Sequence, residues 1–158
     1  MNHQFTVCAE AGRSTLTLSV DLPDGWARCN GSNAEMHLES PDGTKACYLY
    51  LRAVDTPIDL MEALNAARTS ESATLAQMAG RAWDCLADEV VSSPTQVVSI
   101  RDNLDREGLY RIVDKLIVTD RAIARGAFHD YYCEDYQESK AYFARLIESL
   151  RLVDGSGA

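Results

Sequence analysis

The sequence predicts an α+β domain: an antiparallel β-sheet with two central helices and a C-terminal helix packed on it. Three observations support this prediction. Strand-like alternation fills the first third of the chain, helical periodicity replaces it in the middle, and from Thr95 to Val153 three strand-like runs lead into an amphipathic helix. With 158 residues, of which 46% are hydrophobic and 25% charged, the chain has the size and balance of one globular domain.

The first third of the chain is predicted to form strands. From Ser14 to Val20, apolar and hydroxyl side chains alternate with the period of a strand that has one buried face. The segment from Leu22 to Trp26 supplies the Pro and Gly of a turn, and Trp26 then returns to the core. A second strand is predicted over 34–39. The turn Pro41-Asp42-Gly43-Thr44 predicts a hairpin into a third strand from Lys45 to Ala53.

Two helices are predicted in the middle third. Thr56-Pro57 is a helix start, and apolar residues follow it at spacings of three and four. Residues 69–72 are expected to interrupt this helix. A second helix is expected from Thr74 to about Val90, with Trp83 on its buried face.

The last third is predicted to be a three-stranded meander and a closing helix. Strands are expected around Val98 and Ile100, from Leu109 to Val118 and from Ala122 to Asp130, with tight polar turns between them. The helix is expected to begin near Glu134, where acidic residues suit its N-terminal dipole. We predict a single domain over residues 1–153 and a flexible tail over residues 154–158.

Three segments resemble the PsbP-like family, whose bacterial branch includes the DcrB-type proteins. They are the turn Leu22-Pro23-Asp24-Gly25-Trp26, the turn Thr119-Asp120-Arg121-Ala122, and the closing helix that ends Leu-Ile-Glu-Ser-Leu-Arg-Leu. The resemblance spans roughly Leu16 to Leu152. It implies an α/β sandwich without catalytic activity that serves as an accessory, chaperone or partner-binding module. Some bacterial relatives are chaperones for type VI secretion effectors or immunity proteins beside toxins. The family has no universal functional residues, so the resemblance implies fold and class alone.

The charge of the chain favours a basic protein partner. Its formal net charge of -9 comes from 24 acidic and 15 basic side chains spread over both halves. Phosphate backbones and anionic lipids repel such a protein, so nucleic acid and membrane partners are not expected. The N-terminus lacks the pattern of a signal peptide and no apolar run is long enough to span a bilayer, which predicts a cytoplasmic location.

Neither a metal nor a cofactor is expected from the sequence. The five cysteines are odd in number and widely spaced, and no C-x-x-C occurs, so neither a disulfide framework nor a structural zinc site is indicated. The motifs of hydrolases, zinc proteases and nucleotide-binding enzymes are missing too, and we therefore predict a protein that is not an enzyme. His37 falls on the polar face of a strand, where we expect it to be solvated.

The residues from His129 to Tyr136 hold the densest chemistry and admit several interpretations. His129 and Cys133 could form a base and nucleophile pair, and Asp130, Glu134 and Asp135 could hold calcium, although their spacing matches no calcium loop. The segment also fits a strand-to-helix junction with acidic residues at a helix N-terminus. Finally, tyrosines beside acids suit a surface that binds a basic protein.

A second candidate surface lies on the strand from Lys45 to Ala53. Tyr48 and Tyr50 point to the sheet face opposite Leu49 and Leu51. Either a helix covers that face and the tyrosines belong to the core, or the face is open and binds a partner. In the meander, Asp114 and Arg125 are expected to form a cross-strand ion pair.

We therefore predict an immunity protein that binds and neutralises a basic toxin of a type VI-like secretion system. An acidic partner can occupy the basic surface that a nuclease-type toxin needs for its substrate. The predicted binding residues are Asp130, Tyr131, Tyr132, Glu134, Asp135, Tyr136, Glu138, Tyr48 and Tyr50. One alternative is an effector chaperone that holds an apolar segment on an open Tyr48/Tyr50 face; another is a small hydrolase that uses Cys133 and His129. The sequence leaves open whether the protein is a monomer or a homodimer.

Overall fold

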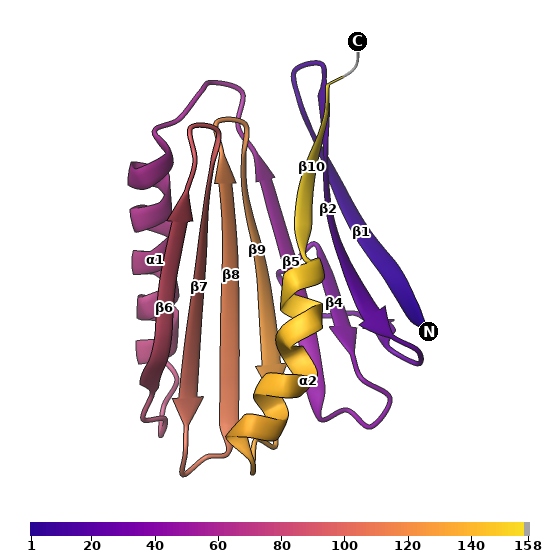
Figure 1. The fold of residues 1–158 in the computed structure, drawn as a ribbon, viewed down its shortest axis with the longest axis vertical. Helices are drawn as coiled ribbons and strands as arrows, with labels where there is room; N and C mark the ends of the chain where they lie inside the picture. The colour runs from indigo at the N-terminus through magenta and orange to yellow at the C-terminus, as the bar shows by residue number, and fades with distance from the viewer. Residues whose placement is uncertain (157–158) are drawn as a thin grey trace.

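The computed structural model describes residues 1–156, and over that range the chain forms two antiparallel sheets and two helices (Figure 1). The smaller sheet has the order β1-β2-β10 and the larger one β3-β4-β5-β9-β8-β7-β6. The strands of the smaller sheet are β1 (Asn2–Ala11), β2 (Ser14–Pro23) and β10 (Arg151–Ser156). Those of the larger sheet are β3 (Ala27–Cys29), β4 (Met36–Glu39), β5 (Lys45–Ala53), β6 (Asp84–Ser92), β7 (Gln96–Asp105), β8 (Tyr110–Thr119) and β9 (Ala122–Asp130). The helices are α1 (Leu60–Ala76) and α2 (Tyr136–Ser149).

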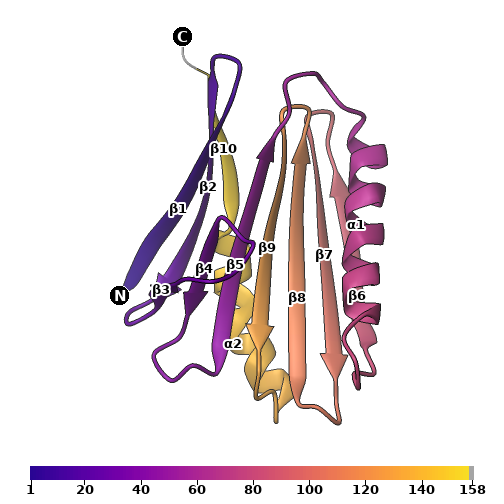
Figure 2. The same cartoon turned by 180° about the vertical axis from the view of Figure 1, so that it is seen from behind.

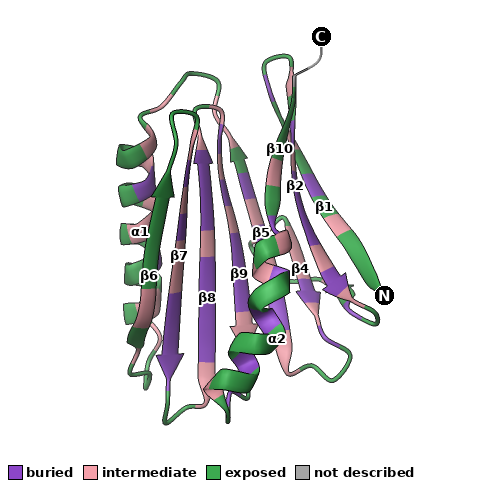
Figure 3. Ribbon diagram, viewed as in Figure 1, coloured by how far each residue is buried: buried purple, intermediate pink, exposed green. Residues whose placement is uncertain are grey.

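The two helices cover opposite faces of the larger sheet (Figures 1 and 2). Helix α1 packs on β7 and β8, whereas α2 packs on β9 and on β2 of the smaller sheet. The smaller sheet also contacts β5. The main core lies between the larger sheet on one side and the smaller sheet with α2 on the other, as the buried stripes along β2, β8 and β9 show (Figure 3). Neither helix in the described range has the length and apolar character needed to cross a membrane.

Each face of the larger sheet has its own apolar cluster. In the main core, Leu16 and Leu18 of β2 pack in one cluster with Phe128 of β9 and Phe143 of α2, all of them almost fully buried. A smaller cluster under α1 is built around Leu64. This separation matches the strands, because successive side chains of a strand point to opposite faces.

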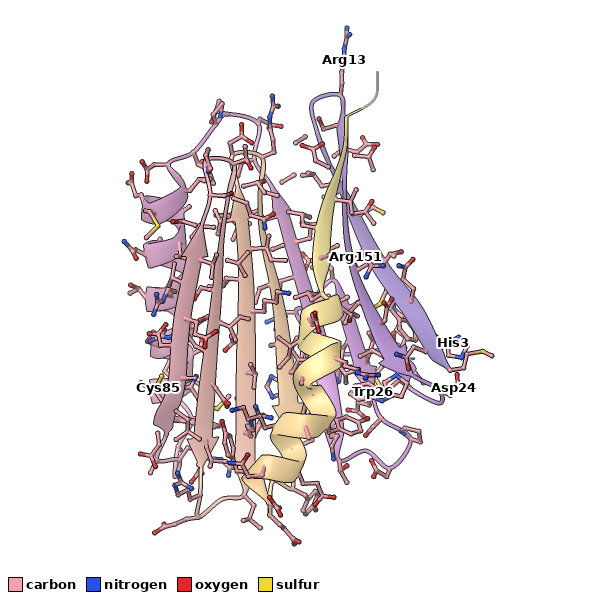
Figure 4. All side chains as sticks on the ribbon, viewed as in Figure 1. His3, Arg13, Asp24, Trp26, Cys85 and Arg151 are labelled. Carbon is pink, nitrogen blue, oxygen red and sulfur yellow. The ribbon has the colours of Figure 1, made fainter. Side chains whose placement is uncertain are left out.

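The meander and the closing helix are confirmed. Strands β7, β8 and β9 pair in sequence as antiparallel neighbours. Helix α2 begins after its N-cap Asp135, whose carboxylate accepts a hydrogen bond from the backbone N–H of Glu138. Trp26 is buried as expected, and its indole N–H donates to the hydroxyl of Tyr142 at 3.3 Å. In Figure 4 its side chain lies between α2 and the smaller sheet.

The middle third differs from the two helices that the sequence predicts. Helix α1 runs without a break through residues 69–72, and strand β6 takes the place of the second helix. The hydroxyls of Thr69 and Thr74 donate to backbone carbonyls four residues earlier, so these polar residues are satisfied inside the helix. Trp83 lies on the link to β6 and is only partly buried, with its ring against Tyr110. It is therefore not the core residue that the predicted helix would have made it.

Both ends of the described range lie in strands, although the sequence analysis names a strand at neither end. Strand β1 pairs along its whole length with β2, and β10 pairs with the other edge of β2. The predicted flexible tail thus begins inside a strand, because Asp154, Gly155 and Ser156 pair with β2; residues 157–158 lie outside the described range. At the start of β1, His3 lies beside Asp24, with 2.5 Å between ring nitrogen and carboxylate oxygen (Figure 4).

Candidate functional site

The junction between β9 and α2 brings five of the predicted binding residues around one hollow. The hollow measures about 210 Å³ and also touches Lys45 and Tyr142. Its predicted residues, which we call the acidic hollow, are Asp130, Tyr132, Glu134, Asp135 and Glu138. Two of these carboxylates stand at the start of α2, where the partial positive charge of the helix N-terminus stabilises them.

The side chains of the acidic hollow differ in accessibility. Tyr132 is 65% exposed, and Glu134, Asp135 and Glu138 are exposed too. Asp130 is buried: its carboxylate accepts the backbone N–H of Tyr132 at 3.2 Å and lies 3.9 Å from the ammonium of Lys45. Asp130 therefore stabilises the junction between β9 and α2, whereas the other four side chains are accessible to a partner.

Two of the predicted tyrosines point away from this hollow. The hydroxyl of Tyr131 lies 3.0 Å from that of Tyr48 on the α1 face of the sheet. The hydroxyl of Tyr136 donates to Asp102 at 2.7 Å, beneath α2. Both side chains are only partly exposed and hold neighbouring elements together. The predicted binding residues thus lie on two different faces of the larger sheet.

His129 and Cys133 lie in different surroundings. The ring of His129 sits on the α1 face, where its Nδ1 is 2.5 Å from the hydroxyl of Tyr110. Burial, followed by the charge of Arg125, lowers the pKa of His129 to about 3. Burial raises the pKa of the Cys133 thiol, which is opposite to the shift that activates a nucleophile. The arrangement gives the pair no feature of a thiol and base site.

The Tyr48/Tyr50 face is partly covered and partly open. Helix α1 packs on β7 and β8, and a cavity of about 520 Å³ remains between the helix and β5, β8 and β9. We call this cavity the α1 groove. Its lining includes Tyr50 and Arg125, together with the apolar residues Ile58, Ala63, Ala66, Ala67, Leu116 and Ile123. Tyr48 lies further along the same face, in a smaller cavity of about 140 Å³ that shares Tyr50 and Arg125 with the groove.

An ionic cluster forms the polar end of the α1 groove. The Nε of Arg125 donates to Asp114 at 2.8 Å and lies 3.5 Å from Glu71, and its guanidinium stacks over Tyr50 at 5.0 Å. The predicted pairing of Asp114 and Arg125 is confirmed, although Asp114 is buried rather than surface-exposed. Glu71 joins them from α1. Because this contact depends on how the helix docks, sequence spacing held no sign of it.

Burial changes the protonation of this cluster. Desolvation, together with the nearby charge of Asp114, raises the pKa of Glu71 to about 8, although the charge of Arg125 opposes the shift. Burial also raises the pKa of Asp114. Two buried carboxyl groups thus compete for one guanidinium, and at neutral pH Glu71 retains its proton most of the time.

Aromatic rings continue the face beyond the groove. The ring of His37 stacks on Tyr48 with centroids 4.2 Å apart, and Tyr48 meets His129 edge-on at 4.7 Å. The expected solvation of His37 is wrong, since its side chain is only 12% exposed. The period of two along β4 placed His37 on the correct face, but the sequence could not show that Tyr48 of the neighbouring strand would cover it.

Comparisons with known proteins place the fold and go no further. No family model matches the chain, and no curated protein matches its sequence. Among solved structures, the chain is similar to the solution structure of cyanobacterial PsbP (CyanoP) from Synechocystis sp. PCC 6803, with a TM-score of 0.66 and 10% sequence identity. The match covers 96% of this chain and 92% of that one. The protein therefore has a PsbP-like α+β fold, as the sequence analysis predicted. At this identity the likeness shows the fold alone.

Proposed function

We propose that this protein is a non-enzymatic, cytoplasmic binding module that recognises a basic protein through the acidic hollow. The observation that supports the proposal most is the exposure of Tyr132 beside Glu134, Asp135 and Glu138 on one surface. Tyrosine is a frequent anchor of protein interfaces, because it buries a large apolar ring while its hydroxyl keeps a polar partner. The three carboxylates around it would pair with Lys or Arg of the partner.

The charge of the whole chain supports the same choice. A net charge of -9 attracts a basic partner over a distance of several ångströms and speeds the encounter, whereas phosphate and anionic lipid are repelled. Recognition through exposed carboxylates should also weaken when salt is added, since the Debye length falls from about 10 Å at 0.1 M salt to about 3 Å at 1 M.

The particular role that we propose is immunity. The basic partner would be a toxin of a type VI-like secretion system, and the acidic hollow would cover the surface with which that toxin holds its own anionic substrate. The resemblance to DcrB-type proteins, together with the acidic surface, supports this role. Binding alone would suffice for protection, so no reactive group is required.

A pull-down followed by co-expression tests this function. The wild-type chain, the variant Glu134→Lys/Glu138→Lys and the control Glu10→Lys/Glu89→Lys serve as baits in lysate of the native cell. Glu10 on β1 and Glu89 on β6 are exposed, so the control makes the same change of charge elsewhere. A basic protein should be captured by the wild type and the control but not by the hollow variant.

The captured protein is then expressed in a host with and without the chain. Arrested growth that the wild type and the control rescue, and the hollow variant does not, supports immunity. A partner that leaves growth unaffected, or rescue by all three forms, contradicts it.

A second candidate function is that of an effector chaperone, and the α1 groove favours it. The groove is lined largely by apolar side chains, and three alanines of α1 leave room beside the sheet. An apolar segment of an effector could lie there. Because apolar burial is insensitive to screening, a complex formed in the groove should keep its affinity from 0.05 to 1 M salt, whereas a complex at the acidic hollow should lose it.

A further inference from the structure

Three side chains with metal-binding groups meet at the β3–β4 edge of the larger sheet. Cys29 of β3 is directly paired with His37 of β4, and Glu39 lies two residues beyond His37 on the same face. Their donor atoms, which are the thiol sulfur, a ring nitrogen and a carboxylate oxygen, all lie within 4.8 Å of one another. The cluster lies at the opposite end of the strand order from β6 and is separate from the acidic hollow.

The imidazole of His37 lacks the partners that a buried ring normally has. Both ring nitrogens are buried, and neither makes a hydrogen bond. The Nε2 atom lies 3.3 Å from a carboxylate oxygen of Glu39 without hydrogen-bond geometry. A buried polar group without a partner costs free energy and is a sign of a missing ion or water. Two ligands of one metal ion show this relation, because their lone pairs converge on the ion rather than on each other.

Neighbouring residues fix the orientation of the His37 ring and leave it accessible to a ligand on one side. Stacking on Tyr48, with an angle of 12° between the two ring planes, fixes the orientation of His37. On the other side, the loop between β3 and β4 encloses a hollow of about 180 Å³ that Cys29 and His37 both line. A small ion and a water molecule fit in that volume.

We propose that Cys29, His37 and Glu39 bind one zinc ion, with a fourth coordination position open towards the hollow. Zinc accepts thiolate, imidazole and carboxylate together, whereas magnesium and calcium prefer oxygen ligands and copper(I) prefers sulfur. Zn–S distances of about 2.3 Å and Zn–N or Zn–O distances of about 2.0 to 2.2 Å put the ligand atoms of a tetrahedral site about 3.3 to 3.6 Å apart. His37 and Glu39 already meet this spacing, and the sulfur of Cys29 lies within 4.8 Å of both.

The site follows from strand pairing, and no motif along the sequence indicates it. Structural zinc sites are recognised in a sequence by cysteines or histidines a few residues apart. Here the thiol is eight positions from His37, and only the antiparallel register of β3 and β4 brings it across from the ring. Strand β3 has only three residues, so an ion bound by residues of β3 and β4 would also stabilise the pairing of this short strand.

Zinc titration of the purified 158-residue chain tests the proposal. After removal of metal with a chelator, Zn²⁺ alone is added in competition with a chromophoric chelator. The wild type should bind one equivalent, and Cys29→Ser should bind at least about 100-fold more weakly, since loss of even a ligand's supporting partner costs about 10- to 100-fold. Cys85→Ser is the matched control, because Cys85 is an exposed thiol on β6 at the far edge of the sheet (Figure 4).

Cobalt supplies a readout that reports the ligand itself. Co²⁺ bound by the wild type or by Cys85→Ser should show a thiolate-to-metal charge-transfer band in the near ultraviolet, which Cys29→Ser should lack. Glu39→Gln, at a partly exposed position, provides a second variant whose fold is checked by circular dichroism. Less than one equivalent of zinc in the wild type, or equal zinc affinity in the wild type, Cys29→Ser and Glu39→Gln, would overturn the proposal.

Discussion

Arg111 and Asp102 form a two-pronged ion pair beneath α2, with Nε and Nη2 of the arginine each 2.9 Å from a carboxylate oxygen. The pair is almost fully buried. It also holds the helix, because Tyr136 donates to Asp102 and the other guanidinium nitrogen donates to Ser139 at 3.0 Å. The ion pair on β7 and β8 thus fixes the first turn of α2, where the acidic hollow begins.

Removing one partner of this pair should destabilise the protein strongly. Asp102→Ala leaves the guanidinium of Arg111 buried without its counterion, and a loss of about 3–5 kcal/mol in the free energy of unfolding is expected. Asp88→Ala is the control, since Asp88 is partly exposed and pairs with Arg68 and Arg101; its loss should be under about 1 kcal/mol. Urea denaturation measures both. Similar losses in the two variants would show that the buried pair does not anchor α2.

The stability of the protein should fall as pH rises from about 6.5 to 8, and Glu71→Gln should reduce that fall; below about pH 6.5 the buried His129, whose pKa is lowered to about 3, gives a slope of the opposite sign. The pKa of Glu71 is raised from 4.5 to about 8 in the folded state, so the folded state holds this proton more tightly than the unfolded chain. Stability from that proton is fully present below pH 4.5 and is lost as pH passes 8. Burial raises the pKa of Asp114 as well, so its proton acts on stability with the same sign.

Denaturation midpoints measured across this pH range test the assignment. Glu62→Gln is the control, because Glu62 is an exposed carboxylate on the same helix. If Glu62→Gln flattens the profile as much as Glu71→Gln does, Glu71 is not the titrating group.

Tyr132 should be the energetic anchor of the proposed partner complex. Tyr132→Ala is expected to weaken binding of the captured basic protein by about 30-fold, or about 2 kcal/mol, mainly through faster dissociation. Val91→Ala, which shortens another exposed apolar side chain on β6, should leave the affinity unchanged. Surface plasmon resonance with both variants measures the two rates. An unchanged dissociation rate in Tyr132→Ala would place the interface elsewhere.

Gly126 is required by the close approach of α2 to β9. A Cβ atom at this position would lie 2.5 Å from a methyl carbon of Leu150 and 3.3 Å from the ring of Phe128, and both of those side chains are buried. Gly126→Ala should therefore cost about 1–3 kcal/mol. Gly155→Ala meets only the carbonyl of Thr15 at 3.4 Å and should cost far less. Thermal denaturation distinguishes the two, and equal melting temperatures would contradict the packing argument.

The strands with regular alternation could be predicted from the sequence, and the irregular elements could not. Strands β5, β8 and β9 have both faces covered or adjoin turns that the sequence marks clearly. They form where the sequence predicts them. Strand β6 has a bulge between Cys85 and Ala87, and most of its residues are exposed to solvent. It therefore lacks the regular alternation of a strand, and the four-residue spacing of Leu86 and Val90 indicated a helix instead. Strand β1 has a regular alternation of Phe5, Val7, Ala9 and Ala11, but its first residues are polar and exposed, so the pattern begins only at Phe5.

The candidate sites show the same limit. Acidic residues at the start of α2 follow from local sequence, and they could be proposed as binding residues from it, whereas the hollow around them depends on the folded junction. The contact of Glu71 with Arg125, and the meeting of Cys29 with His37, depend on docking and register between separate elements. No periodic pattern in the sequence indicates such contacts, because they form only when the separate elements of the sheet come together.

The pairing of β10 with β2 has a consequence for biosynthesis. Strand β2 is made among the first residues, but its second neighbour consists of residues 151–156, more than a hundred residues later. During translation, the edge of β2 that pairs with β10 therefore keeps unpaired backbone groups until the end of the chain is made. Such an edge can associate with other nascent chains.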